Sequence, residues 1–160
     1  MREKILQILE KNSRIDLHDL AIMLDMNEVD LANEIAEMEK ENIICGYHTL
    51  INWDNTSNEK VTALIEVTVT PHRGMGFDKM AACIYQYDEV DAVYLMSGSY
   101  DFTVIIEGKT MKDISFFVSD KLSPIEGILR TATHFVLKKY KDHGTQLVAS
   151  NSDERMLVSP

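Results

Sequence analysis

The chain has 160 residues, of which 45% are hydrophobic and 26% are charged, and these values, close to those of ordinary globular proteins, exclude disordered and fibrous classes. This length allows one core of ordinary size or two small domains. The formal net charge is −10 at pH 7. Such a charge argues against a protein that coats nucleic acid nonspecifically, because duplex affinity comes largely from Lys and Arg.

No apolar run approaches the roughly 18 to 20 residues that a membrane helix needs, and Met1 leads into an amphipathic segment rather than a signal peptide. We therefore expect a cytoplasmic protein with no membrane partner. Cys45 and Cys83 stand apart from each other and from the His residues, so neither a disulfide framework nor a zinc site has the spacing it requires. We expect no metal and no cofactor.

Three short helices are predicted at the start of the chain. Apolar residues recur at helical spacing over 3–11 and again over 17–24, where Asp16 is a suitable N-cap. Asn27 can cap a third helix, and Asn42 suits the left-handed residue that ends one. Three helices with a tight connection between the second and the third indicate a helix-turn-helix.

A second domain is predicted after a linker. Residues 43–47 and 50–53 are β-prone, and the polar stretch 54–60 has the character of a linker. The segments beyond it alternate between strand and helix periods: a strand over 61–70, a helix over 77–87, strands over 90–96 and 100–107 around the turn 97–99, a helix capped by Thr110, and a β-prone run over 128–140. This βαββαβ order is the ferredoxin-like pattern, so the fold class is α+β.

Both faces of the predicted sheet carry large apolar groups. Helices should cover one face, and seven apolar residues fall out of phase with the positions on it: Leu64, Val93, Leu95, Ile105, Leu129, Phe135 and Leu137. A sheet face open to water is usually more polar. We infer that a partner subunit covers the second face, which predicts a homodimer or a larger even assembly.

Three short phrases resemble the Lrp/AsnC family. They are residues 41–47, which follow the third helix, the turn Gly98-Ser99-Tyr100-Asp101, and the run 131–135, which is similar to the family's final strand. The resemblance covers essentially the whole chain. It implies a winged helix-turn-helix at 1–47, a β-strand linker at 48–60, an effector-binding and oligomerisation domain at 61–145, and a flexible tail at 146–160.

The resemblance also implies a function, that of a transcriptional regulator. Such a protein binds double-stranded operator DNA through its helix-turn-helix, and its homodimers assemble into tetramers or octamers. A small effector, often an amino acid, binds between the dimers. The residues that we assign to the effector are Gly98, Ser99, Tyr100, Asp101, Thr131 and Thr133. Asp101 suits the effector's ammonium group, and the hydroxyl groups of the Tyr and the two Thr can orient its carboxylate or side chain.

The predicted DNA-binding head, residues 1–47, is unusually acidic. Residues 1–47 hold 5 Lys and Arg against 11 Asp and Glu, a net charge of −6, whereas residues 48–160 hold 11 against 15, a net charge of −4. The residues that we assign to DNA are Asn27, Glu28, Asp30, Asn33, Glu34 and Glu37. Asn33 can pair with adenine, and Glu34 or Glu37 can accept a hydrogen bond from cytosine N4. Alternatively, Asn27 is only a cap and the glutamates only repel phosphates.

Two other classes of protein stay open. In the first, the chain is an oligomeric effector-binding module whose degenerate head does not bind DNA. In the second, it is an enzyme similar to siroheme decarboxylases, which would need His and Arg to converge on a tetrapyrrole, whereas the five His are scattered along the chain. The basic cluster Lys138, Lys139, Lys141 and His143 is interpreted as a strand end protected from aggregation, or as a contact to DNA or to a neighbour's acidic head.

Overall fold

The computed structural model describes residues 1–70, 74 and 76–148, and these fall into two compact units divided between Leu50 and Ile51. We describe each unit by itself. No helix among the described residues is both long and apolar enough to cross a membrane.

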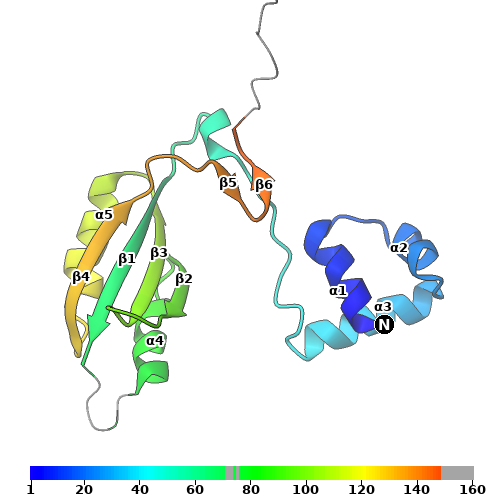
Figure 1. Ribbon diagram of the computed structural model, residues 1–160, viewed down its shortest axis with the longest axis horizontal. Helices are drawn as coiled ribbons and strands as arrows, with labels where there is room; N and C mark the ends of the chain where they lie inside the picture. The colour runs from blue at the N-terminus through cyan, green and yellow to red at the C-terminus, as the bar shows by residue number, and fades with distance from the viewer. Residues whose placement is uncertain (71–73, 75, 149–160) are drawn as a thin grey trace, which may run out of the picture. The chain divides into compact units, whose positions relative to one another are not determined.

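The first unit consists of three helices, as the sequence predicts (Figure 1). They are α1 (Arg2–Lys11), α2 (Leu17–Leu24) and α3 (Glu28–Lys40). The side chain of Asp16 accepts a hydrogen bond from the backbone N–H of His18, and that of Asn27 accepts one from Val29 at 2.8 Å. These bonds satisfy donors at the helix starts that have no partner within the helix. They fix where α2 and α3 begin.

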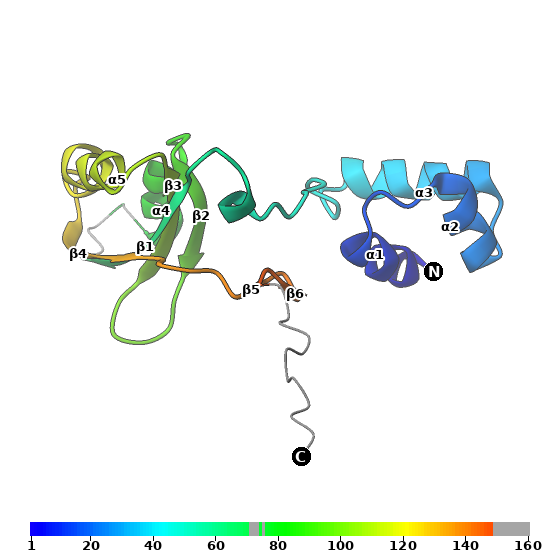
Figure 2. The same ribbon diagram turned by 90° about the horizontal axis from the view of Figure 1, so that it is seen from above.

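The core of the first unit is small and lies between the three helices. Its fully or nearly buried members are Ile5, Leu20, Ala21, Leu31 and Met38. In Figure 2, α3 runs along one side of the unit, while α1 and α2 lie on its other side. Since α3 packs through one face only, its opposite face is left to solvent.

The strand that we expected in the linker is absent from this chain, and so is the wing of the helix-turn-helix. Residues 1–60, all of which the structure describes, contain no strand, and the linker carries instead a short 3-10 helix at Trp53–Asn55. The reason is that a strand needs a neighbour hydrogen-bonded through its backbone, and the backbone of the β-prone run 43–53 pairs with no other strand among the described residues.

The second unit is built on a four-stranded antiparallel sheet in the order β2-β3-β1-β4. Its elements are β1 (Val61–Val69), α4 (Phe77–Tyr85), β2 (Val90–Leu95), β3 (Phe102–Gly108), α5 (Met111–Phe117), which a π-helical turn (Val118–Leu122) continues, and β4 (Ile128–Phe135). A two-stranded hairpin follows, β5 (Lys141–Asp142) and β6 (Thr145–Gln146). The ferredoxin-like βαββαβ order is confirmed. The ordered hairpin also takes up the start of the predicted tail, of which residues 149–160 lie outside the described residues.

Both helices of this unit cover the same face of the sheet (Figure 1). Met80 and Ile84 of α4 and Ile114 of α5 share one core with the alternating buried residues of β1 and β3. Strand pairing sets the register: Ile65 lies between Val104 on β3 and Thr133 on β4.

The open face of the sheet is less apolar than the sequence suggested. Val93 pairs with Val104 and Phe135 pairs with Ala63, so both lie on the helix-covered face and pack against its core. Leu95 pairs with the buried Phe102 and so belongs to the same face. Our assignment of these three residues was wrong because the pairing shifts register in β2 and at the end of β1, which breaks the alternation of faces along a strand. Leu64 and Ile105, which pair directly across β1 and β3, do lie on the open face.

Candidate DNA-binding and effector sites

The outward face of α3 is the candidate DNA-reading surface. Val29, Asn33, Ala36 and Lys40 follow one another at spacings of four, three and four residues, which places them on one side of a helix. All four are exposed, and the Val29 side chain is 67% exposed. Below, these four residues are called the outward face.

Each of the four glutamates of α3 has a partner elsewhere in the first unit. Glu28 lies 3.2 Å from Nδ1 of His18, and Oε1 of Glu39 accepts a hydrogen bond from the hydroxyl of Tyr47 at 2.7 Å. Partial burial and, second, this hydrogen bond raise the pKa of Tyr47. Glu34 and Glu37 are both bound to Arg2 of α1. The carboxylates of these four glutamates therefore point to the sides of α3 rather than along its outward face.

Arg2 binds three carboxylates at once. Its Nε atom donates to Glu34 at 2.8 Å, its Nη1 atom to Glu41 at 2.8 Å and its Nη2 atom to Glu37 at 2.9 Å. The hydrogen bond to Glu34, followed by that to Glu41, raises the pKa of Arg2. Our sequence reasoning missed this contact, although residues 34, 37 and 41 form a visible acidic stripe at helical spacing.

Of the six residues that we assigned to DNA, five lie off the outward face and one lies on it. The side-chain oxygen of Asn27 is occupied by the cap of α3. It accepts from the N–H of Val29 and lies 3.4 Å from the backbone nitrogen of Asp30. Asn33 alone among the six assigned residues belongs to the outward face. Lys40, which the sequence analysis did not single out, lies on the same face about two turns further along the helix.

The turn between β2 and β3 holds four of the predicted effector residues. Gly98 has φ +129°, a backbone conformation that residues with a Cβ rarely adopt, and Ser99 is exposed. Asp101 ties the turn to the end of β1: its Oδ2 atom accepts from the N–H of Val69 at 2.8 Å, and its own N–H donates to the carbonyl of Val67 at 3.0 Å. One carboxylate oxygen of Asp101 is thus used in the fold.

The structure does not bring all six predicted effector residues together. The hydroxyl of buried Thr103 donates to Oη of Tyr100 at 3.3 Å, which draws Tyr100 toward the open face of the sheet. Thr131 and Thr133 pair with Val67 and Ile65 and so lie on the helix-covered face, where the hydroxyl of Thr131 is 3.4 Å from that of Ser123. Tyr100 and the two threonines therefore lie toward different faces of the sheet.

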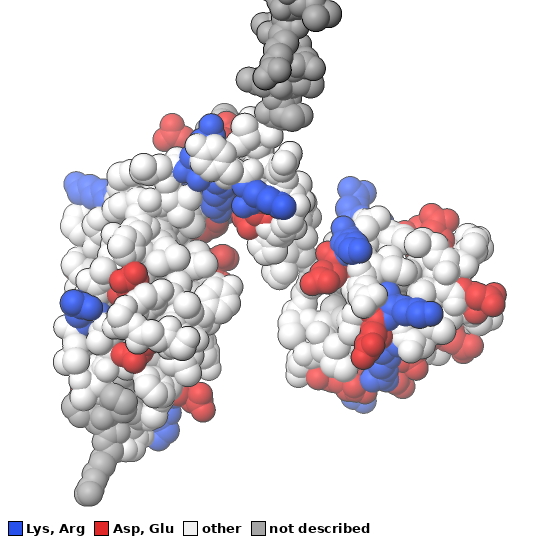
Figure 3. Space-filling view, viewed as in Figure 1, with Lys and Arg blue, Asp and Glu red and all other residues white. Residues whose placement is uncertain are grey.

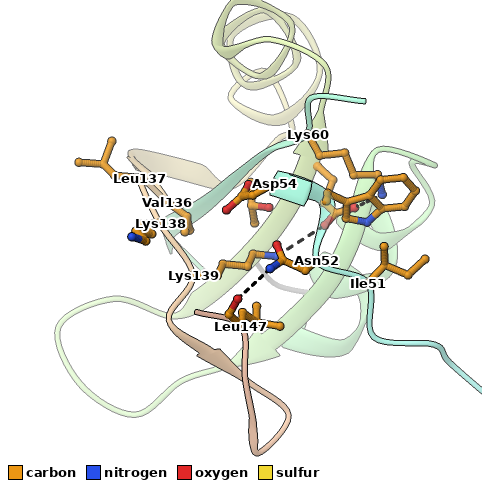
Figure 4. Close-up of a pocket in the computed structure, with 12 residues that line it drawn as sticks. Ile51, Asn52, Asp54, Lys60, Val136, Leu137, Lys138, Lys139 and Leu147 are labelled. Atoms are coloured by element: carbon orange, nitrogen blue, oxygen red, sulfur yellow. Dashed lines mark hydrogen bonds and ion pairs between the residues drawn. The ribbon is translucent and has the colours of Figure 1, made fainter. Parts of the chain in front are cut away.

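A cavity that the sequence did not predict lies at one end of the sheet (Figure 4). Its lining comes from the linker, the sheet end and the chain around the C-terminal hairpin: Ile51, Asn52, Trp53, Asp54, Lys60, Thr62, Glu107, Val136, Leu137, Lys138, Lys139 and Leu147. Nδ2 of Asn52 donates to the carbonyl of Leu147 at 2.8 Å, and Lys60 pairs with Glu107 at 2.7 Å. None of the six assigned effector residues lines it. Figure 3 shows basic side chains gathered over this end of the second unit.

The sequence comparisons decide the family. Residues 62–146, more than half of the chain, match the family model of the Lrp/AsnC ligand binding domain. The chain belongs to the Lrp/AsnC family. An uncharacterised HTH-type transcriptional regulator of Bacillus subtilis, YugG, is 46% identical over 158 residues, which are 98% of this chain and 95% of the relative. The similarity to this regulator therefore extends over the helix-turn-helix as well as the sheet.

Solved structures share the fold of this Lrp/AsnC chain. PH0061 has a TM-score of 0.74 at 21% identity, covering 88% of this chain and 93% of that one. The regulator NMB0573 from Neisseria meningitidis, solved in complex with L-Met, has a TM-score of 0.68 at 24% identity, covering 87% and 89%. At these identities the likeness shows the fold alone.

Proposed function

We propose that this Lrp/AsnC protein regulates transcription by placing the outward face of α3 in the major groove of its operator, under control of a small amino-acid effector. The main support for DNA binding is the outward face of α3. It is exposed, it bears no carboxylate, and the glutamates of α3 are all held by partners at its sides.

The chemistry of the outward face suits base reading. Asn33 carries the amide that pairs with N6 and N7 of adenine, and Val29 and Ala36 offer apolar contact to a thymine methyl group. Lys40 supplies one phosphate contact. Since one cation per head gives little nonspecific affinity, binding depends on several heads acting together in an oligomer.

The test is a binding titration of the full chain against fragments that include its own promoter, at low and moderate salt. We expect Asn33→Ala to lose about 1 to 3 kcal/mol of discrimination at one A·T position, because one bidentate base contact is removed. Asn58→Ala, in the exposed linker, is the matched control and should bind as the parent does. If the parent chain gives no specific complex at any salt, with or without amino acids, the head does not bind DNA and the chain is an effector-binding module.

The effector part of the proposal rests on the family model, which is that of a ligand binding domain, and on the amino acid bound to the Neisseria relative. The turn Gly98-Ser99-Tyr100-Asp101 is our candidate site, because its first two residues are exposed and it ends in a half-buried carboxylate. A thermal-shift screen of the twenty amino acids tests this part, since a ligand that binds only the folded state raises the unfolding temperature. No shift with any amino acid would contradict it.

A further inference from the structure

We propose that Arg2 is a positioning residue for DNA binding, which holds and partly cancels the acidic edge of α3. The acidic edge consists of Glu34, Glu37 and Glu41. This inference rests on the proposed function of the head, because it concerns how α3 approaches phosphates. It assigns a role in DNA binding to a side chain of α1 that need not touch DNA.

The geometry is that of one guanidinium shared by three carboxylates. Each of its three nitrogens donates to a different Glu, at 2.8 to 2.9 Å. Glu34 and Glu37 of α3 and Glu41, the residue that caps the C-terminus of α3, meet it together because spacings of three and four residues bring them onto one side. A planar fork with several fixed donors can do this, whereas the ammonium of a Lys acts as one compact charge.

Stability alone does not account for this cluster. The Arg2 side chain is 37% exposed, and the three Glu side chains are 38% to 62% exposed. A single exposed ion pair contributes little to folding, since water and salt screen it, and a network of such pairs contributes more than one pair does. The effect of Arg2 therefore lies mainly in the local charge and in where the carboxylates are held.

The charge arithmetic favours an effect on DNA binding. The three glutamates of the acidic edge carry three negative charges. The positive charge of Arg2 reduces the net charge of the cluster to −2. The edge flanks the outward face of α3, so each uncancelled carboxylate lies on the helix that meets the phosphates. The repulsion acts on every DNA sequence alike, and it weakens as salt shortens the range of the interaction.

The experiment is a mutant cycle in the full chain, without a tag at the N-terminus. Arg2→Gln is measured in the parent and in a variant that also carries Glu34→Gln, Glu37→Gln and Glu41→Gln. In the parent, we expect Arg2→Gln to lower affinity for operator and nonoperator DNA by about three- to tenfold at low salt, and less than about twofold at high salt. In the triple Gln background, Arg2→Gln should lose clearly less than this, because no carboxylates remain for Arg2 to cancel.

Lys4→Gln is the matched control, since it removes a cation of α1 that makes no ion pair within the described residues. Its effect should be equal in both backgrounds. An equal loss for Arg2→Gln in both backgrounds would mean that Arg2 contacts DNA directly, and no loss in the parent would mean that the acidic edge does not matter. Either result overturns the proposal.

The triple Gln variant tests the role of the acidic edge by itself if Arg2→Gln fails to fold. With Arg2 intact, this variant should bind all DNA more tightly than the parent at low salt, and unchanged or weaker binding would contradict the proposal. If the head binds no DNA in any variant at any salt, the proposed function fails, which is a different result from DNA binding that ignores Arg2.

Discussion

At the scale of single residues, one side chain of the candidate effector site also takes part in the fold. Asp101 is our candidate for the effector's ammonium, and its Oδ2 atom accepts a hydrogen bond from the N–H of Val69. A substitution that removed the whole carboxylate would therefore change both the fold and the site. The replacement has to keep an acceptor oxygen while removing the charge.

Asp101→Asn meets this requirement. Its amide oxygen can still accept from Val69, so we expect the unfolding temperature to change little, while affinity for the amino acid falls about tenfold or more as the charged partner of the ammonium is lost. Calorimetry with the amino acid found in the thermal-shift screen measures the affinity. Ser99→Ala, in the same exposed turn, is the comparison for loss of a neutral group. Unchanged affinity in Asp101→Asn would remove Asp101 from the site.

At the scale of elements, the start of α3 depends on one cap. Asn27→Ala leaves the N–H groups of Val29 and Asp30 without their side-chain acceptor, and should destabilise the head by about 1 kcal/mol. Asp16→Ala removes the equivalent cap of α2 and should have a similar effect on thermal unfolding. Only the loss of the α3 cap should also weaken specific DNA binding, because it frays the element that carries the outward face. Equal DNA affinity in the two variants would show that this fraying does not reach the outward face.

The sequence alone was enough to predict those features that form between residues close together in the chain. The caps Asp16 and Asn27 and the left-handed residue Asn42, which has φ +56°, could be identified because each acts within a few residues of itself. Arg2 and Glu34 are 32 residues apart, and Asn52 and Leu147 are 95 residues apart, so no periodicity within a helix or strand connects them. The cluster and the cavity that they form emerge only from tertiary packing.

At the scale of the whole molecule, the open face of the sheet is the candidate interface between subunits. Leu64 and Ile105 lie on it as a direct cross-strand pair on the two central strands. They share this face with Glu66 and His134, which are 3.5 Å apart on β1 and β4. The face is thus mixed rather than uniformly apolar, and a subunit that covered it would bury polar groups beside the leucine and isoleucine.

We expect Leu64→Glu to weaken self-association, because a carboxylate at this position would lose its hydration when the interface forms, whereas the leucine side chain gains from burial. The folded subunit should tolerate the change, since the side chain of Leu64 is only partly buried and faces away from the helix-covered core. Light scattering at micromolar concentration measures the mass, and we expect the parent to be a dimer or a larger even assembly. Tyr85→Glu, at a 62% exposed position on α4, is the control and should keep the mass of the parent. A folded Leu64→Glu variant with unchanged mass would show that subunits associate through another surface, and a monomeric parent would contradict the assembly altogether.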